Sequence, residues 1–331
     1  MTTVDIVIPC YRYGKFLKQC VDSVITQHDV EVRLLIIDDA SPDDSPEIAE
    51  ELARQDNRIE IVRHTRNKGH ITTYNEGIEW AKADLFLLLS ADDYLLAGAL
   101  SRAAELHRAN PDMSFAFGDA ILAYDDGTQA ARKPFGTAFS DTTKVFACAD
   151  FIKAMEGRNI VPTPTAIVKT AVQKKVGGYS HHLPHAGDMA MWLNLSAEGP
   201  VGFVGAPQAA YRMHSHNMSR SYSSARLPDL QQRQAAIEHF LERIRSTRSD
   251  VEQFRRILMR DLAVSASMQA AAAFDERESD ISRQLAKFAL TLDPTIRFSL
   301  PWLRLHLHKA IGPRGWQILR SSLGVSAGVP D

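Results

Sequence analysis

Residues 30–39 read VEVRLLIIDD, an apolar strand-like run that ends at two aspartates. Its last apolar residues, 34–37, follow one another without a polar break, which is typical of a strand buried on both faces. A β-branched run at residues 4–8, VDIVI, stops at Pro9. Between the two runs, apolar residues recur on one helical face: Phe16, Leu17, Cys20, Val21, Val24 and Ile25. The chain therefore opens with a strand, a helix and a second strand.

The alternation of strands and helices continues to residue 89. A helix with Ser45 as its cap and Pro46 in its first turn is followed by a strand at residues 59–62, a helix at 71–80 and a strand at 85–89. This order predicts an α/β fold with a mostly parallel central sheet that helices cover on both faces. Ligands of such sheets bind beyond the carboxyl ends of the strands, and the candidate site residues should therefore lie there.

After residue 110 the pattern changes. Residues 115–124 predict a strand that turns at Asp125-Asp126-Gly127, and residues 128–165 predict mainly loops. A short helix at 188–197 precedes strand-like residues near 201–204 and 209–212. From residue 226 onward the chain is rich in helix formers and holds 16 of the 38 basic but 12 of the 40 acidic residues. We expect one domain at residues 1–225 and a helical C-terminal region at 226–331.

The composition of the whole chain excludes several classes of protein. With 331 residues, 45% of them hydrophobic and 24% charged, the chain is neither disordered nor fibrous. A net charge of -2 argues against a nucleic-acid-binding protein, which would carry a clear basic excess. Three cysteines form no metal or disulfide pattern, and neither a secretion signal nor an apolar run of membrane-spanning length is evident. These features predict a cytoplasmic protein.

Carboxylates follow two of the predicted strands. Asp39 comes just after the second strand, and Asp92 and Asp93 come after the fourth. Because parallel strands end on the same edge of a sheet, we expect both groups there, held by a cation or by hydrogen-bond donors. Oxygen ligands favour Mg²⁺ or Mn²⁺. These three residues are therefore candidate site residues, whereas the nearby Asp43-Asp44 pair is interpreted as part of a turn.

Five short blocks occur in order between residues 4 and 219. They are VDIVIPCY (4–11) with SVITQ (23–27) and IDDAS (37–41); NKG (67–69) with NEGI (75–78); LSADD (89–93); GDMAMWL (187–193); and YRMH (211–214) with Ser219. Together they resemble the family 2 glycosyltransferases. Each block is weak by itself, but the ordered set covers about two-thirds of the chain.

The resemblance implies a GT-A fold with a nucleotide-sugar half at residues 1–110 and an acceptor half at 111–225. It also implies inverting transfer of a sugar from a nucleoside diphosphate, with Tyr11 and Asp39 at the nucleobase. The implied contacts to the nucleotide sugar are Pro9, Tyr11, Asp39, Arg66, Gly69, Asn75, Asp92 and Arg212. The implied ligands of a divalent metal, Mn²⁺ or Mg²⁺, are Asp92, Asp93 and His214.

Displacement at an anomeric carbon needs a general base for the acceptor hydroxyl, on the face opposite the leaving diphosphate. A single displacement inverts the anomeric centre, and a divalent ion stabilises the departing charge. Asp188 is the candidate base, because it begins a helix anchored by Met189, Trp192, Leu193 and Leu195. The alternative role for Asp188 is that of a helix N-cap, which is compatible with catalysis.

Four positions depart from the family pattern. Ser90 stands where many members carry an acid of the metal-binding motif, and Gly187 replaces a frequent Glu before the base. Tyr74 and Asn194 replace frequent arginines, the second of which could steady a diphosphate. We therefore expect weaker metal dependence and a compensating positive charge from Arg66, Lys68 or Arg212.

The histidines near residue 185 allow a different metal site. His181, His182 and His185 precede Asp188 in a string that could bind a transition metal. Pro184 interrupts any helical spacing, however, and consecutive histidines point apart, so the sequence favours an acceptor-site loop. The remaining histidines of interest are interpreted as surface loop residues, His64 and His70, and as a turn residue, His216.

Residues 294–331 combine Trp, Leu and Ile with Arg and Lys at helical spacing, as in PWLRLHLHK at 301–309. Such a segment could lie on an anionic membrane surface, which would place the protein at the inner face of the cell membrane. The sequence favours two other interpretations, a helix packed on the catalytic domain or a contact between copies of a homo-oligomer.

The leading hypothesis is an inverting glycosyltransferase of cell-envelope polysaccharide synthesis, with a UDP-, GDP- or dTDP-sugar as donor and a glycan or lipid-linked saccharide as acceptor. One alternative is a sugar nucleotidyltransferase, although the loop after the first strand contains only one glycine, Gly14. Another is a protein that binds a nucleotide sugar without turnover, which the serine at position 90 would favour. A dinucleotide oxidoreductase is excluded because no GxGxxG follows the first strand.

Overall fold

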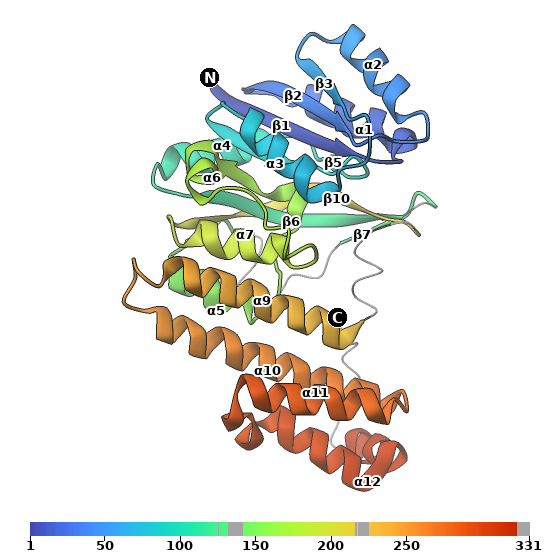
Figure 1. Ribbon diagram of the computed structural model, residues 1–331, viewed down its shortest axis with the longest axis vertical. Coiled ribbons are helices and arrows are strands. Elements are labelled where there is room, and N and C mark those ends of the chain that lie inside the picture. The colour runs from blue at the N-terminus through green and yellow to red at the C-terminus, as the bar shows by residue number, and fades with distance from the viewer. Residues whose placement is uncertain (125, 132–141, 216, 218–224, 323–331) are drawn as a thin grey trace. The chain divides into compact units, whose positions relative to one another are not determined.

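The computed structural model describes the chain except for residues 125, 132–141, 216, 218–224 and 323–331 (Figure 1). The chain divides into two compact units. The first consists of Met1–Ala154 and Asn159–Asn217, and the second of Met155–Arg158 and Met218–Asp331. A four-residue stretch that interrupts the first unit in sequence therefore belongs to the second.

The first half of the first unit alternates strands and helices, as the apolar periodicity predicts. Ser45 is the first residue of its second helix and Asp44 is the N-cap, one position earlier than expected. The elements are β1 (Thr2–Cys10), α1 (Gly14–Ile25), β2 (Val30–Asp38), α2 (Ser45–Gln55), β3 (Ile59–Arg63), α3 (His70–Trp80), β4 (Leu85–Leu88), β5 (Tyr94–Leu95) and α4 (Ala99–Ala109).

The second half of this unit contains more short elements than expected, among them β7, β8 and η1 within residues 128–165. Residues 201–213 form one strand rather than two, because pairing with its neighbour resumes after a register shift between Val204 and Ala209. An eight-residue helix lies within the stretch expected to be loops. The elements are β6 (Phe115–Tyr124), β7 (Gln129–Ala131), β8 (Lys144–Phe146), α5 (Cys148–Met155), η1 (Thr163–Thr165), β9 (Ile167–Lys169), α6 (Thr170–Val176), α7 (Gly187–Ser196) and β10 (Val201–Met213).

The predicted hairpin after residue 124 is confirmed. β6 and β7 are antiparallel, and the N–H of Gly127 donates to the carbonyl of Tyr124 across the turn at 3.0 Å. Gly127 has a φ of 82°, a left-handed conformation that glycine adopts without strain. Asp125, also expected in this turn, lies outside the described residues.

The ten described strands form one sheet in the order β3-β2-β1-β4-β9-β6-β10-β5, with β7 beside β6 and β8 beside β10. The strands β1 to β4 are mutually parallel, and β6 is parallel to β10. The short strand β9 joins these two groups and is antiparallel to both of its neighbours. The predicted α/β fold with a mostly parallel sheet is confirmed.

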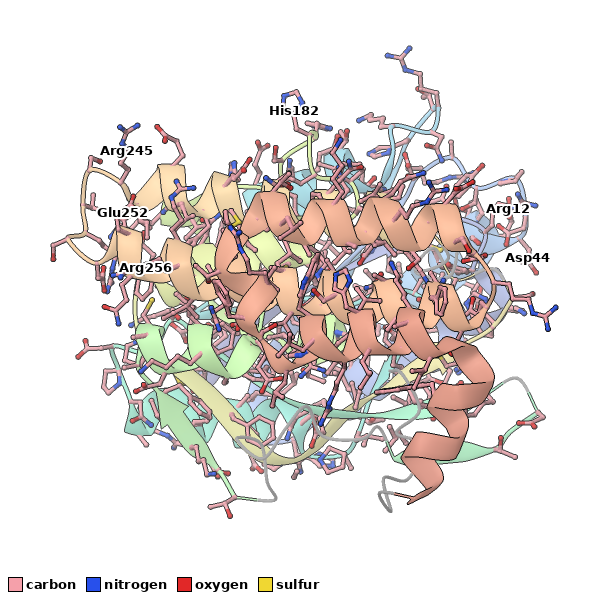
Figure 2. The ribbon with its side chains drawn as sticks, turned by 90° about the horizontal axis from the view of Figure 1, so that it is seen from below. Arg12, Asp44, His182, Arg245, Glu252 and Arg256 are labelled. Carbon is pink, nitrogen blue, oxygen red and sulfur yellow. The ribbon has the colours of Figure 1, made fainter. Side chains whose placement is uncertain are left out.

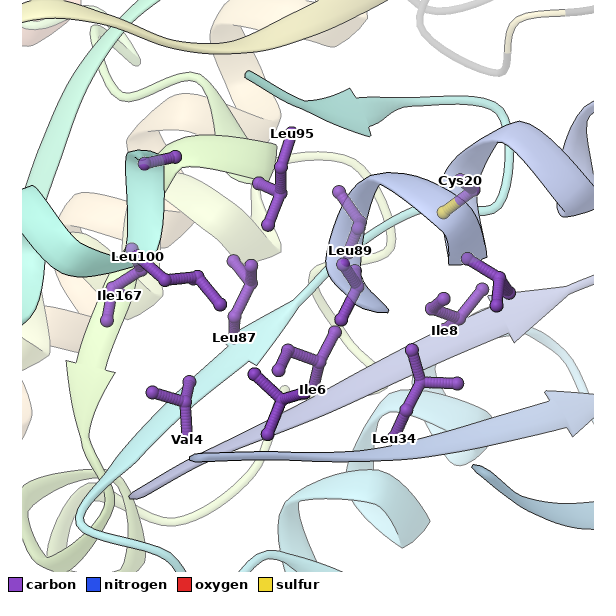
Figure 3. Packing of buried hydrophobic residues seen from close by; sticks show 14 of the residues in the cluster. Val4, Ile6, Ile8, Cys20, Leu34, Leu87, Leu89, Leu95, Leu100 and Ile167 are labelled. Atoms are coloured by element: carbon purple, nitrogen blue, oxygen red, sulfur yellow. The ribbon is translucent and has the colours of Figure 1, made fainter. Parts of the chain in front are cut away.

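The core of the first unit lies between the sheet and its helices. Ile6 and Ile8 of β1, Leu34 of β2 and Leu87 of β4 are fully buried (Figure 3). Burial of each such side chain contributes about 1.5–3 kcal/mol to stability. In β2, every residue from position 34 to position 38 is buried, as the unbroken apolar run predicts for a strand covered on both faces.

β1 continues through Pro9, although the sequence indicates a stop there. The carbonyl of Val7 accepts from the N–H of Leu89, so Val7 directs its hydrogen-bonding groups toward β4. Pro9 lies two residues further on and faces the same side, where β4 has already ended at Leu88. The missing N–H therefore costs no hydrogen bond of the sheet, and β1 extends far enough to place Cys10 beside Asp38.

The second unit is built from helices. Its core includes Phe240, Phe254, Leu258 and Leu262, which are fully buried. The last helix contains a kink at Gly312, whose φ of 73° and ψ of 169° are not helical. The elements are α9 (Arg226–Ile244), α10 (Val251–Asp275), α11 (Ser279–Leu292), η2 (Pro294–Phe298) and α12 (Leu300–Ser322). Across the described residues, no helix is both long and apolar enough to cross a membrane.

Candidate active site

The acidic pair that follows β4 lies at the meeting point of two distant parts of the chain. Asp92 and Asp93 lead directly into β5, and β5 pairs with β10 through Tyr94 and Ala210. This pairing brings the end of β10 beside the two carboxylates, so that the backbone N–H of Arg212 donates to Asp93 Oδ1 at 2.8 Å. Both aspartates are buried, with 5% and 3% of their surface exposed.

The side chains of Ser90, His214 and Tyr13 contact the carboxylate of Asp92. Its Oδ1 accepts from Ser90 Oγ at 2.5 Å, and its Oδ2 lies 3.0 Å from His214 Nε2. The buried His214 ring packs against Phe16 and Tyr13, with ring centroids 5.1 and 5.6 Å apart. Ser90, at the position where the family pattern often has an acid, thus supports Asp92 by a hydrogen bond.

These side chains fit a small divalent cation. Carboxylate oxygens and an imidazole nitrogen are ligand types that Mn²⁺ accepts, and Asp92 Oδ2 and His214 Nε2 lie 3.0 Å apart, at hydrogen-bonding distance. Burial and the charge of Asp92 raise the pKa of Asp93 well above its usual range, and the backbone N–H and the charge of Arg212 offset part of this rise. Among the described residues, however, no group of three or more His, Cys, Asp or Glu side chains is arranged around one point. The metal therefore stays a prediction.

Arg212 supplies positive charge at the same place. Its Nε donates to the backbone carbonyl of Asp92 at 2.8 Å, and an Nη donates to Gln19 at 2.6 Å. The guanidinium also packs on the ring of Phe16, with Cζ 4.5 Å from the centroid. Of the three cations expected to compensate for missing arginines, Arg212 is the one that lies against the acidic pair.

Asp188 lies in the first turn of α7, and hydroxyl groups contact its carboxylate. Thr163 Oγ1 donates to Oδ2 at 2.9 Å, and the Tyr179 hydroxyl donates to the same carboxylate. Burial of the carboxylate raises the pKa of Asp188, and these two hydrogen bonds partly offset the rise. The N-cap of α7 is Ala186, and Asp188 is the second residue of the helix. The alternative role of Asp188 as an N-cap is therefore not observed.

Tyr74 lies near both carboxylate groups. Burial of its phenol and the charges of Asp188, Asp92 and Asp93 together raise the pKa of Tyr74. Its ring also packs edge-on against that of Tyr179, with centroids 5.4 Å apart. Tyr74 thus contacts Tyr179, a partner of the candidate base, and its phenol is also subject to the charges of the candidate metal ligands.

Sequence reasoning missed two residues of this site, Thr163 and Tyr179. Thr163 lies in η1, and Tyr179 lies in the loop before α7; neither is part of a recognisable motif. They reach Asp188 only through the fold, so no local sequence signal marks them. Tyr74, in contrast, is visible in the sequence as a departure from the family pattern.

Asn75 holds the loop that leads to Asp188. Its Oδ1 accepts from the N–H of Tyr179 at 2.7 Å, and its Nδ2 donates to the carbonyl of the same residue at 3.0 Å. A Cβ at Gly178 would lie 2.4 Å from Asn75 Oδ1, so the contact requires a glycine there. Both polar atoms of the amide are engaged by the backbone, and the expected contact to the nucleotide sugar stays a prediction.

Asp39 orders the loop that precedes α3. Its carboxylate accepts from the N–H groups of Lys68 at 2.7 Å and Gly69 at 2.9 Å, and it lies 2.7 Å from His64 Nδ1. The other ring nitrogen of His64 lies 2.7 Å from Glu76, which also pairs with Lys68 at 2.8 Å. The interpretation of His64 as a surface residue was wrong, because 8% of it is exposed.

The other predicted nucleotide contacts lie around the ends of β1 and β2. Pro9 is partly buried in β1, whereas Tyr11, at 41% exposure, and Arg66 are open to solvent. The strands β2, β1 and β4 are neighbours in the sheet. Asp39, after β2, and Asp92, after β4, therefore lie at the carboxyl ends of parallel strands, as expected. Within the described part of the chain, no hydrogen bond or ion pair joins these two aspartates directly.

The histidine string before Asp188 gives no support to a transition-metal site. His181 and His182 are exposed, and the His182 side chain extends away from the surface (Figure 2). No three-ligand group of the described chain includes this string. His70, interpreted as a loop residue, is instead the first residue of α3 and contacts the carbonyl of Pro184 at 3.3 Å. His216 lies outside the described residues.

Comparison with known proteins extends these observations. Residues 5–154 match the family model described as glycosyl transferase family 2. The uncharacterized glycosyltransferase EpsJ of Bacillus subtilis is 32% identical over 102 residues, which are 31% of this chain and 29% of that protein. The GalNAc(5)-diNAcBac-PP-undecaprenol beta-1,3-glucosyltransferase of Campylobacter jejuni is 25% identical over 123 residues, 37% of this chain and 39% of that protein. The chain thus spans well under half the length of these curated relatives.

The fold extends beyond the segment that the family model matches. The structure of S. aureus TarS 1-349 in complex with UDP-GlcNAc aligns with a TM-score of 0.68 at 15% identity, over 98% of this chain and 92% of that chain. The α/β unit followed by helices is therefore the fold of a GT-A type glycosyltransferase. Within that class, residues 5–154, a little under half of the chain, resemble glycosyltransferase family 2.

Proposed function

We propose that this protein is an inverting glycosyltransferase that moves a sugar from a nucleoside diphosphate to a hydroxyl of a glycan or lipid-linked acceptor. The observation that carries the proposal is the geometry on both sides of Tyr74: its ring packs on Tyr179, which donates to Asp188, and the charges of Asp188, Asp92 and Asp93 raise the pKa of its phenol. A base and a diphosphate-binding group close to the same point are what a single displacement requires.

Asp188 has the environment of a general base. In the proposed reaction, the acceptor oxygen forms a bond to the anomeric carbon while the bond from that carbon to the diphosphate oxygen breaks. The proton of the acceptor hydroxyl passes to Asp188, whose raised pKa makes its carboxylate a stronger proton acceptor. Thr163 and Tyr179 fix the orientation of the carboxylate by donating to it. Attack from the face opposite the leaving group inverts the anomeric centre.

The leaving diphosphate would lie at the end of β4. Asp92, Asp93 and His214 would hold Mn²⁺ or Mg²⁺, which when bound stabilises the charge that develops on the diphosphate. Arg212 adds a fixed positive charge beside these carboxylates. Because Ser90 donates to one oxygen of Asp92, that oxygen is less available to an ion, and we expect metal dependence to be weaker than with an acid at this position.

The nucleobase would lie against the ends of β1 and β2. Tyr11 is exposed and can stack on a base. Asp39 Oδ2 accepts one bond, from Gly69, and retains a lone pair for a ring N–H of the base. Arg66 is exposed and can reach a phosphate. These contacts are compatible with UDP-, GDP- and dTDP-sugars, and the UDP-GlcNAc in the TarS structure makes UDP-sugars the first to test.

The acceptor is proposed from the sequence similarity to a curated relative. The name of the Campylobacter relative includes an undecaprenol-linked saccharide, and we infer a lipid-linked acceptor of cell-envelope polysaccharide synthesis for this chain. We place this acceptor in the half formed by residues 111–225, because η1, α7 and the loop before α7 surround Asp188 there. A cytoplasmic location would match a donor that is a soluble nucleotide sugar.

The test is transfer by the purified full chain, with Mn²⁺, from UDP-, GDP- and dTDP-sugars to soluble glycans and lipid-linked saccharides. Release of the nucleoside diphosphate measures turnover, and NMR of the product measures the anomeric configuration. We expect one donor class to react, with inversion. Turnover only with a sugar phosphate and a nucleoside triphosphate, releasing pyrophosphate, would instead identify a nucleotidyltransferase.

The first variant to compare is Asp188→Asn, which keeps the shape of the side chain and removes its basicity. We expect it to lower kcat by about 10²- to 10⁴-fold, the usual contribution of a general base, while nucleotide binding is unchanged. The control is Glu79→Gln, an exposed position on α3. An unchanged kcat in Asp188→Asn would remove Asp188 as the base, and wild-type binding without turnover of any donor would favour the non-catalytic alternative.

A further inference from the structure

The last helix presents apolar side chains to solvent. Phe298, at the end of η2, is 78% exposed, and four residues of α12 are between 41% and 67% exposed. We name this set the α12 stripe: Phe298, Leu300, Leu303, Leu307 and Ile311. These are five of the twelve large apolar side chains that are exposed in the described part of the chain, and they fall within fourteen consecutive residues.

The α12 stripe is one face of a helix that is apolar on two sides. Positions 300, 303, 307 and 311 are three or four residues apart, so they lie along the same side of the helix. A different face carries Leu305 and His308, which are buried inside the helical unit, where the His308 ring packs edge-on against Phe274 with centroids 5.2 Å apart. Packing inside the second unit therefore explains why one face of α12 is apolar. It does not explain why the α12 stripe is apolar, because those side chains are exposed.

The charge around the stripe discriminates between possible occupants. Residues 294–330 contain no acidic residue and five basic ones: Arg297, Arg304, Lys309, Arg314 and Arg320. Arg297 and Arg304 are exposed beside the stripe. If the stripe of a second copy occupied this face, basic residues would meet basic residues, which opposes association. A bilayer with anionic headgroups offers the opposite charge together with an apolar layer beneath it.

We propose that the α12 stripe binds the surface of a bilayer that contains anionic lipids. The stripe side chains enter the boundary between headgroups and acyl chains, and Arg297 and Arg304 pair with lipid phosphates. This contact lies along the surface and does not span the bilayer. The inference is independent of the chemistry at Asp188, and it would bring the protein to the membrane in which a lipid-linked acceptor resides.

The test is co-sedimentation of the full chain with vesicles of phosphatidylcholine alone and of phosphatidylcholine with about 30% phosphatidylglycerol. We expect binding to the anionic vesicles only, weakened by about 0.5 M salt, since screening reduces the attraction between the arginines and the lipids. Leu303→Ser with Leu307→Ser should lower the partition coefficient about tenfold or more. Arg297→Gln with Arg304→Gln should also lower it, and should reduce its salt dependence.

Two controls separate this contact from general effects. Met268→Ser changes a 62% exposed apolar residue on α10 and should leave vesicle binding unchanged. Asp188→Asn should also bind vesicles like the wild type, so that failure of the membrane contact and failure of the catalytic proposal can be told apart. No sedimentation of the wild type with either vesicle would overturn the proposal. So would a dimer, measured by light scattering, that the double serine variant converts to a monomer while vesicle binding is absent throughout.

Discussion

Asp188 is subject to two opposite influences on its protonation. Burial disfavours the charged carboxylate, whereas the hydroxyl groups of Thr163 and Tyr179 stabilise it by donating hydrogen bonds. Burial is the larger influence, and the pKa is raised. Since a general base must be ionised before it accepts a proton, the balance between burial and these two hydroxyls sets the acid limb of the pH–rate profile.

Removing either hydroxyl should move that limb. In Tyr179→Phe or Thr163→Val the ionised form of Asp188 loses a donor, so its pKa should rise further and activity should be lost at a higher pH. A hydrogen bond to a charged group contributes about 1.5–3 kcal/mol, which corresponds to a shift of about one to two pH units. The measurement is kcat/KM as a function of pH, with Tyr124→Phe on the exposed end of β6 as the control. A uniform loss of activity with an unmoved limb would show that these hydroxyls serve another purpose.

The candidate base, the acidic pair and His214 were all predictable from the sequence, because each belongs to a block that resembles the family. Their partners were not. Thr163 is 25 residues from Asp188 and has no signature of its own. His64 looks like an ordinary loop histidine in sequence, and its contacts with Asp39 and Glu76 arise only when α3 and the loop after β3 fold against the end of β2. Sequence motifs therefore identify the candidate site residues. The hydrogen-bond partners of those residues become visible only in the folded structure.

At the scale of elements, α3 is connected to the loop before α7 through one side chain. Asn75 of α3 bonds both the N–H and the carbonyl of Tyr179, and the glycine at 178 allows the close approach. The same loop residue, Tyr179, donates to Asp188 through its hydroxyl. Asn75 thus fixes the backbone from which a partner of the base projects.

This arrangement distinguishes two roles for Asn75. If it positions the loop, Asn75→Ala should lower kcat about tenfold or more while a nucleoside diphosphate still stabilises the protein as in the wild type. If it contacts the donor, as the family resemblance implies, the same variant should lose that stabilisation. Asn75→Asp keeps the acceptor for the N–H of Tyr179 and should fall between the wild type and the alanine variant. The readouts are kcat, KM for the donor and the melting temperature with and without diphosphate.

The helices and strands of the first ninety residues can be predicted from the local periodicity of apolar residues. The later elements are predicted less well. Buried strands such as β2 and amphipathic helices such as α1 leave a pattern that a window of residues reveals. β10 looks like two strands because the polar and turn-forming residues near Pro207 interrupt the apolar pattern, although pairing with β6 resumes at Ala209. The eight residues of α5 are too few for a clear period.

At the scale of the whole molecule, the proposed chemistry and the proposed membrane contact belong to different units. Asp39, Asp92 and Asp188 all lie in the first unit, and the α12 stripe lies in the second. The sequence already separates them by charge, since residues 226–331 have four more basic than acidic residues whereas residues 1–225 have six fewer. A ligand of the first unit should therefore stabilise that unit directly, and changes in the stripe should leave its binding unchanged.

Thermal unfolding with nucleoside diphosphates tests the donor site within this division. A ligand that binds the native state at about 100 times its Kd adds about 2.7 kcal/mol of stability, which for a unit of this size corresponds to a rise in Tm of about 5–10 °C. We expect one member of the set UDP, GDP, dTDP and CDP to produce this rise, and Mn²⁺ to increase it. Asp93→Asn should abolish the increment due to Mn²⁺, whereas Leu303→Ser with Leu307→Ser should respond like the wild type. A flat response to all four diphosphates, with and without Mn²⁺, would leave the fold intact and remove the donor site proposed at the ends of β1, β2 and β4.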